Sequence, residues 1–156
     1  MNSTQIELAL VRHLNSRINL IVPNVYWGLG LHYEADLIVV KPSQWAYEIE
    51  IKTSLPDLKA EKKKRYNAHC SNKFKYLYFA VPEKLKEQAL ELIPERSGLF
   101  IVKENEMVIL VRPPKINKNA RKLNLNEMKK LYELCQMRIW NLKEIIYSNR
   151  LKRIVR

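Results

Sequence analysis

The stretch Tyr47-Glu48-Ile49-Glu50-Ile51-Lys52 decides the fold of this chain, because charged and apolar side chains alternate along it. A period of two is the pattern of a β-strand, in which successive side chains point to opposite faces. Glu48, Glu50 and Lys52 therefore share one face, and the apolar residues share the other. We expect the apolar set to face the core and the charged set to face water, a partner or an ion.

The preceding segment predicts a partner strand. Residues 32–40 end in the apolar run Leu37-Ile38-Val39-Val40, and the short turn 41–44 leads directly to a strand over 45–52. Strands joined this closely pair as a hairpin. Asp36 lies where polar sequence gives way to the apolar run, so the hairpin would bring it towards Glu50.

The rest of the chain alternates between helix-like and strand-like patterns. We expect helices over 5–16, 56–69, 83–92 and 124–147, and further strands over 19–27, 75–81, 98–102 and 107–111. Thr4 with Glu7, and Asn124 with Glu127, have the spacing of capping boxes. The order predicts an α/β fold, with a mixed central β-sheet flanked by helices and a C-terminal helical extension. We divide the chain into a core over 1–112 and a basic linker with the C-terminal helix over 113–156.

The C-terminal helix carries an apolar stripe that needs a surface to cover it. Its members are Met128, Leu131, Cys135, Ile139, Leu142 and Ile146. We expect the stripe to pack on the body of the protein, and docking to a second copy or to a partner protein is the alternative.

Composition bounds the class of protein. With 156 residues and 47% hydrophobic content the chain fits one domain. It has no apolar run long enough to span a membrane, and residues 1–5 lack the pattern of a signal peptide. Cys70 and Cys135 form no Cys-x-x-Cys pair, so we expect reduced thiols in a cytoplasmic protein.

The net charge of +12 is unevenly distributed. Residues 112–156 hold 13 of the 28 basic residues and 3 of the 16 acidic ones, and residues 59–65 form a second basic cluster. A basic excess of this kind attracts phosphate backbones, although it is also found on solvated surfaces that bind nothing specific. DNA is therefore the expected partner, and a membrane surface is not.

Asp36, Glu50 and Lys52 together form a candidate catalytic site. Two carboxylates held close together repel each other unless a cation lies between them, and Mg²⁺ or Mn²⁺ prefers such oxygen ligands. A lysine beside them could stabilise the charge that develops on a scissile phosphate. The alternative is an ordinary half-exposed strand, in which Glu-x-Lys occurs by chance and Glu48 hydrogen-bonds a neighbour.

In context, the pattern resembles the PD-(D/E)XK nuclease superfamily. The similarity lies in Ala35-Asp36-Leu37 on one strand and Glu50-Ile51-Lys52 on the next, followed by a helix and a hydrophobic strand. The match is closer to the MmcB-like DNA repair family, through the run 50–58, Lys63, Tyr78-Phe79-Ala80-Val81-Pro82 and Gly98-Leu99. It covers roughly residues 6–111.

The resemblance implies a Mg²⁺- or Mn²⁺-dependent deoxyribonuclease in repair, recombination or phage DNA processing. Asp36 and Glu50 would be metal ligands, Lys52 the catalytic lysine and Glu7 an additional acidic residue near the metal. Lys59, Lys62, Lys63 and Tyr66 would contact DNA. The alternative is a non-catalytic nucleic-acid-binding protein, or a partner of a nuclease, that retains the fold.

Three aromatic residues in the strand segments leave two interpretations open. Trp27, Tyr33 and Trp45 could stack on unpaired bases, but aromatic residues in strands more often pack against neighbouring strands. We expect packing.

Overall fold

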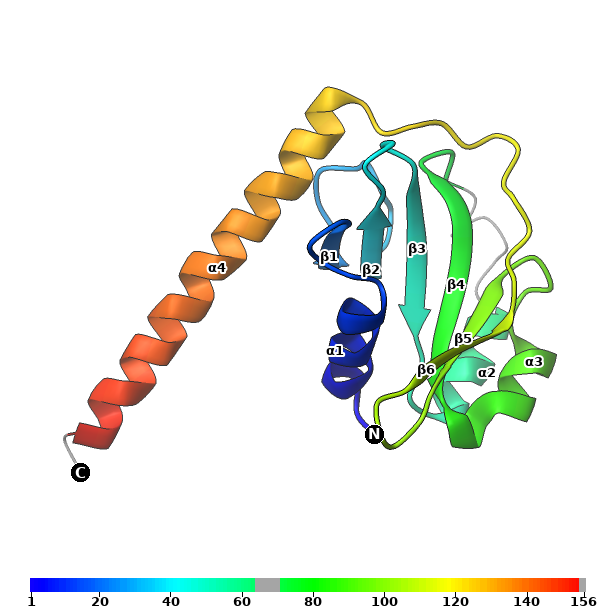
Figure 1. The fold of residues 1–156 in the computed structure, drawn as a ribbon, viewed down its shortest axis with the longest axis horizontal. Helices are drawn as coiled ribbons and strands as arrows, with labels where there is room; N and C mark the ends of the chain where they lie inside the picture. Colours follow the sequence, from blue (N-terminus) through cyan, green and yellow to red (C-terminus); the bar gives the residue numbers. More distant parts are fainter. Residues whose placement is uncertain (64–70, 155–156) are drawn as a thin grey trace.

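The computed structural model describes residues 1–63 and 71–154, which form a mixed sheet flanked by helices (Figure 1). Its six strands are β1 (Leu20–Val25), β2 (Ala35–Val40), β3 (Ala46–Ile51), β4 (Phe74–Pro82), β5 (Gly98–Val102) and β6 (Val108–Arg112). Its helices are α1 (Ser3–His13), α2 (Leu55–Lys63), the short 3₁₀ helix η1 (Glu83–Leu85), α3 (Lys86–Leu92) and α4 (Leu125–Ile154). The expected α/β class and element order are confirmed.

The strands lie side by side in the order in which they occur along the chain. β1, β2 and β3 pair antiparallel, so the predicted β2–β3 hairpin is confirmed. β3, β4 and β5 run parallel, with α2 and then η1–α3 as the crossover connections, and β6 returns antiparallel to β5. β3 and β4 therefore occupy the centre of the sheet, where apolar side chains on both faces are covered.

Helices cover both faces of the sheet. α1 packs through Ile6 and Leu10 against the face that includes Ile49 and Ile51 of β3. The opposite face carries two apolar clusters, one under the start of α4 around Leu131 and one under α2 and α3. In the register, Glu48 pairs with Ile38 of the first cluster on one side and with Leu77 of the second on the other, so the acidic side of β3 lies between them.

The cap of α1 differs from the predicted one. Asn2 is the N-cap, and its side chain accepts a hydrogen bond from the Gln5 amide while the Gln5 side chain accepts one from the Asn2 amide. The expected pairing of Thr4 with Glu7 was wrong, because Asn2 and Gln5 have the same spacing two residues earlier and Asn is as good a cap as Thr. Glu7 is therefore not held at the cap of the helix.

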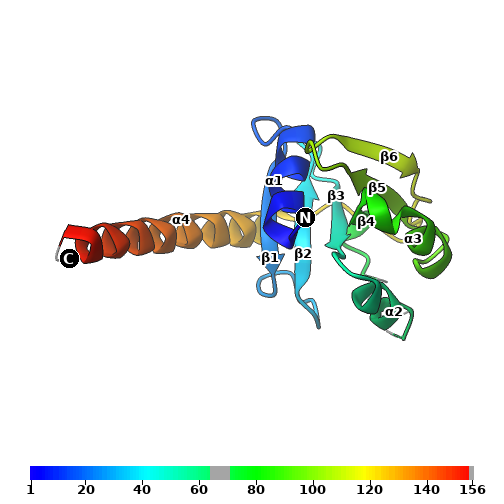
Figure 2. The same ribbon diagram turned by 90° about the horizontal axis from the view of Figure 1, so that it is seen from below.

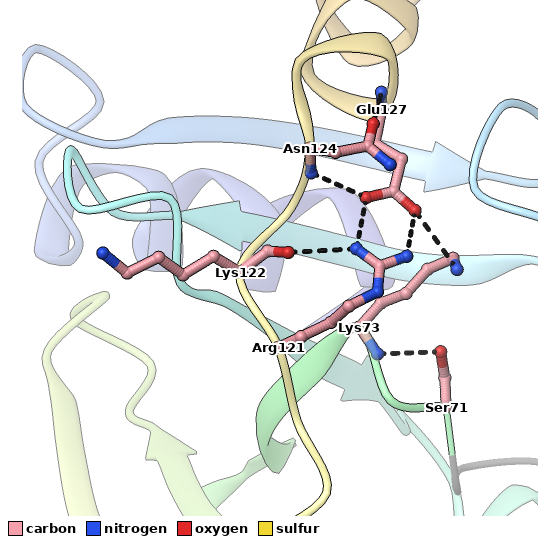
Figure 3. A network of polar contacts seen from close by, with 6 residues as sticks. All are labelled: Ser71, Lys73, Arg121, Lys122, Asn124 and Glu127. Carbon is pink, nitrogen blue, oxygen red and sulfur yellow. Dashed lines mark hydrogen bonds and ion pairs between the residues drawn. The ribbon is translucent and has the colours of Figure 1, made fainter.

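A cluster of polar contacts, the root clasp, fixes the linker and the start of α4 (Figure 3). Asn124 and Glu127 form the predicted capping box, with bonds of 2.8 and 2.9 Å between side chains and amides. Arg121 also donates two hydrogen bonds to the Glu127 carboxylate, at 2.7 and 2.8 Å, and Lys73 Nζ lies 3.2 Å from it. Arg121 holds the pKa of Glu127 down at about 2, with smaller contributions from the Asn124 amide and Lys73. The clasp thus ties residues 121–127 to the start of β4.

The two halves of α4 have different surroundings. Leu131 is fully buried, Met128 and Cys135 pack beside it, and Arg138 donates hydrogen bonds to the carbonyl oxygens of Pro23 and Asn24. The C-terminal half of the helix extends away from the body of the protein in both views (Figures 1 and 2).

The outer half of α4 corrects the expected packing of the stripe. Ile139, Leu142 and Ile146 are more than half exposed, because the body ends at β1 and the helix continues past it. In the described part of the chain, no helix is both long and apolar enough to cross a bilayer.

Candidate metal and phosphodiester site

Two strands bring Asp36 and Glu50 together. Leu37 pairs with Ile49 in the antiparallel register, so the next step outward sets Asp36 opposite Glu50. Directly opposed residues point to the same face of a sheet. Asp36 Oδ2 also accepts a hydrogen bond of 2.7 Å from the Ile51 amide, which ties the Asp36 side chain to the end of β3.

Lys52 completes the group. Its Nζ lies 2.7 Å from Glu50 Oε2 and 3.8 Å from Asp36 Oδ2, so both carboxylates share one ammonium. The Lys52 amide donates a 3.0 Å hydrogen bond to the Ala80 carbonyl oxygen, which continues the pairing with β4 beyond the end of β3. The amides of Ile51 and Lys52 are therefore bonded to β2 and β4 respectively, and the Lys52 ammonium is directed to the two acids.

Burial is graded across the three side chains. The Glu50 side chain is 3% exposed, that of Lys52 is 11% exposed and that of Asp36 is 34% exposed. All six residues of β3 are buried, so the charged side of the strand is not the half-exposed surface that the alternative assumed. Because a charge held this far from water requires a counter-charge, the ion pair is part of the fold as well as a candidate site. Asp36 is therefore the side of the group that solvent reaches.

Glu48 lies on the same face but has a local partner. Its side chain is buried, and Glu48 Oε2 accepts a 2.9 Å hydrogen bond from the Tyr33 hydroxyl. This contact is the neighbour hydrogen bond given as the alternative role of Glu48, and the Tyr33 ring packs as expected, against the apolar cluster around Leu131.

Glu7 lies close enough to Asp36 for the two carboxyl groups to interact electrostatically. Burial raises the pKa of the Glu7 carboxyl, and the negative charge of Asp36 raises it further, whereas Arg138 acts in the opposite direction. Among the residues that the structure describes, however, no three His, Cys, Asp or Glu side chains form a group that could hold a metal. Glu7 thus lies near the acid pair, and its place as an additional acidic residue beside a metal stays a prediction.

The residues present fit a hard cation that keeps part of its water shell. Mg²⁺ is commonly bound by one or two carboxylates, with waters and substrate phosphate completing the octahedron. Asp36 and Glu50 supply that pair, and the shared Lys52 ammonium shows that one positive group can serve both carboxylates.

The expected DNA-contacting residues are only partly described. Lys59 is exposed on α2, whereas the side chains of Lys62 and Lys63, and Tyr66 as a whole, lie outside the described residues. A basic group that the sequence analysis missed lies near Glu48, where Arg96, Lys115 and Lys118 line a hollow of about 150 Å³. The linker builds it, because the Lys115 amide bonds to the Arg96 carbonyl and the Asn117 amide to that of Lys75. The basic composition of residues 112–121 indicated a positively charged segment. The sequence did not show that this segment lies against β4.

Two comparisons with known proteins agree with this architecture. A family model described as DNA repair protein MmcB-like matches residues 5–138. A solved structure of a protein of unknown function from Silicibacter pomeroyi superposes with a TM-score of 0.66 and 19% sequence identity, covering 96% of this chain and 94% of that one. Identity at that level shows a shared fold alone. A search of the curated proteins gave no match.

Proposed function

We propose, from the premise that the chain belongs to the DNA repair protein MmcB-like family, that it is a divalent-metal-dependent deoxyribonuclease. The family description connects the chain with DNA repair, and hydrolysis of a phosphodiester bond is our extension of it. One observation carries the extension: acids from two neighbouring strands converge on a single lysine ammonium at the end of β3. Assignment to the PD-(D/E)XK superfamily is part of the same proposal.

In this proposal Asp36 and Glu50 hold Mg²⁺ or Mn²⁺. When bound, the ion would supply charge neutralisation at the scissile phosphate and a water of lowered pKa. Asp36 is the more accessible ligand, and its Oδ2 is oriented by the Ile51 amide. Glu7 is an additional acidic residue near the metal, acting on Asp36 through charge.

Lys52 contributes a fixed positive charge. A donor that is already oriented where negative charge develops stabilises a transition state without further reorganisation. The Lys52 side chain is mostly buried and its backbone is bonded to Ala80, so its position is set before substrate arrives. A phosphate bound beside the two acids would meet this ammonium, which would stabilise the negative charge that develops on it.

DNA would be held mainly through its phosphates. Lys59 on α2 and the basic residues after Arg112 account for most of the net positive charge, and Lys62, Lys63 and Tyr66 belong to the same proposed surface. Contacts of this type position a duplex or a strand without reading its sequence.

Cleavage of labelled DNA with and without Mg²⁺ or Mn²⁺ tests the proposal. Asp36→Asn, Glu50→Gln and Lys52→Ala should each abolish cleavage while DNA binding is largely kept. Glu48→Gln is the matched control, since it removes a buried charge from the same face of the same strand and leaves an acceptor for Tyr33. Manganese titration followed by electron paramagnetic resonance gives an independent readout, in which Asp36→Asn should weaken binding.

The nuclease proposal fails if the unmodified protein cleaves no DNA with either ion, or if Glu48→Gln and Glu50→Gln lose activity equally. In the first case the non-catalytic nucleic-acid-binding alternative becomes the better account.

A second function, docking to a partner protein, is favoured by the outer half of α4. Ile139, Leu142 and Ile146 lie on one side of a helix that has left the body, and Trp140 beside them is also 56% exposed. Light scattering with and without residues 139–156 tests it. A dimer that becomes monomeric on truncation assigns this surface to a second copy, whereas a monomer in both forms leaves a different protein as the partner.

A further inference from the structure

An aromatic hollow of about 300 Å³ lies on the face of the sheet opposite Glu48 and Glu50. Five rings line it, from Trp45, Tyr47, Tyr76, Tyr78 and Phe100. Tyr47 pairs with Tyr76 across β3 and β4, and Tyr78 packs edge-on against Tyr47 and stacks on Phe100 at a centroid distance of 4.9 Å. The strands thus hold the rings of the hollow in fixed positions.

Two lysines lie at the same hollow. Lys75 Nζ lies 4.4 Å from the centre of the Trp45 ring, and Lys41 Nζ lies 5.7 Å from that of Tyr47. Among the described residues that line the hollow, none is Asp or Glu. Its charge is therefore positive, in contrast to the acidic site on the other face.

The hollow is open to solvent, unlike a closed core. Trp45, Tyr76 and Tyr78 are half-buried, and the turn before β3 leaves Lys41 and Ser43 exposed beside it. Its volume is at the lower end of small-molecule sites, which suits one planar ring system. Aromatic faces flanked by cations are the combination that binds single-stranded nucleic acids.

We propose that this hollow binds an unpaired base of a DNA strand. The base stacks on the rings of Trp45 and Tyr76, and Lys41 and Lys75 pair with the phosphates on either side of it. The ammonium of Lys75 leaves the Trp45 ring when the base enters, because a cation–π contact at an accessible site is weaker than the stacking of a base. Duplex DNA is excluded, since its bases are already stacked on one another.

The site is independent of the proposed hydrolysis. It uses no residue of the acid pair, and it lies on the other face at the opposite end of β3, where Tyr47 is the lining residue nearest to Glu50 along the strand. Binding is therefore measured in EDTA, so the presence or absence of cleavage has no bearing on the result.

Tryptophan fluorescence gives a direct readout. The chain has three tryptophans, and the double variant Trp27→Phe, Trp140→Phe leaves Trp45 as the reporter. A short oligothymidylate should quench its emission, whereas the same sequence in a duplex and thymidine monophosphate should do so only at much higher concentrations. Monophosphate binding as tight as that of the strand would assign the hollow to a free nucleotide and overturn the proposal.

Affinity measurements on variants give the second test. Trp45→Ala should weaken oligothymidylate binding roughly tenfold. Trp27→Ala is the matched control and should change little, because Trp27 also lies beneath a lysine, Lys130 at 4.5 Å, but outside the hollow. Lys75→Gln, which leaves the rings in place, should weaken binding and reduce its salt dependence, and it serves if Trp45→Ala does not fold. Equal losses in Trp45→Ala and Trp27→Ala, or no loss in Lys75→Gln, would contradict the proposal.

Discussion

The root clasp and the candidate site arrange the same groups in opposite ways. In the clasp one carboxylate, that of Glu127, lies between two cations, Arg121 and Lys73. In the candidate site one ammonium, that of Lys52, lies between two carboxylates, Asp36 and Glu50. A carboxylate between cations is stabilised in its charged form, and this is why the pKa of Glu127 falls to about 2.

The difference separates a structural ion pair from the proposed cation site. The clasp bonds a linker, a strand and a helix cap together, and its donors are all supplied by the protein. The candidate site holds two acids and one lysine on one face of the sheet, so its carboxylates outnumber its cations. Burial alone does not distinguish the two, because the Glu50 and Glu127 side chains are 3% and 10% exposed.

The largest expected effect is on cleavage. Glu50→Gln should lower the cleavage rate on the order of a hundredfold or more, since one of two metal ligands loses its charge. Glu127→Gln should leave the rate within about twofold in folded protein, because the clasp contacts no reacting group. Comparable losses in the two variants, measured on the same DNA, would remove the distinction between the sites.

The next effect is on folding stability, and here the clasp variant, not the candidate-site variant, should show the loss. Glu127→Ala should lower the free energy of unfolding by about 2 kcal/mol, because Arg121 and Lys73 lose their shared partner and α4 loses half of its capping box. Urea denaturation measures it. Glu133→Ala on the same helix is the control and should cost less than about 0.5 kcal/mol, since its lysine partners are exposed. A larger loss at Glu133 than at Glu127 would be inconsistent with the clasp.

An effect of similar size should appear as a pH dependence. The pKa of Glu127 is lowered from 4.5 to about 2 in the folded protein. The stabilisation is therefore complete above pH 4.5 and is lost as the pH falls from 4.5 towards 2. It amounts to about 2 kcal/mol once screening of the half-exposed Arg121 is allowed for. Denaturation at several pH values should show this loss in the unmodified protein, and Glu127→Gln should remove it.

The smallest effect concerns Glu7. Asp36→Asn should lower the pKa of the Glu7 carboxyl towards its ordinary value, because a neighbouring negative charge is removed, while burial continues to raise it. Arg138→Gln should shift it in the other direction. Carbon-detected NMR titration follows both shifts. An unchanged Glu7 pKa in Asp36→Asn would show that Glu7 does not interact with the site.

The local part of this comparison was readable from the sequence. The short turn after Val40 predicted the hairpin, and the period of two in β3 put Glu50 and Lys52 on one face. Together these two features predicted that Asp36 lies beside Glu50. The capping box at Asn124 was predicted for the same reason, because all its members are close in sequence. At α1 the sequence contains two residue pairs with capping-box spacing, and the predicted pair, Thr4 with Glu7, is not the one that caps the helix.

Contacts between distant segments were not readable. Lys73 joins Glu127 across more than fifty residues, and the aromatic hollow combines the turn before β3 with β4 and β5. The stripe on α4 has the same period along its whole length, so the sequence does not show where the body of the protein ends and only its first half is covered.

The position of the α4 anchors gives the outer half of the helix a defined direction. Two anchors hold the helix: the cap at Asn124, and the bonds from Arg138 to Pro23 and Asn24. At a rise of 1.5 Å per residue these anchors lie about 20 Å apart along the helix. Two fixed points on a stiff helix define the direction of its axis. The direction in which the outer half extends is therefore set by β1 and the linker. Deleting a single residue between Arg138 and Ile146 would turn the tip by about 100° and leave the sheet as it is.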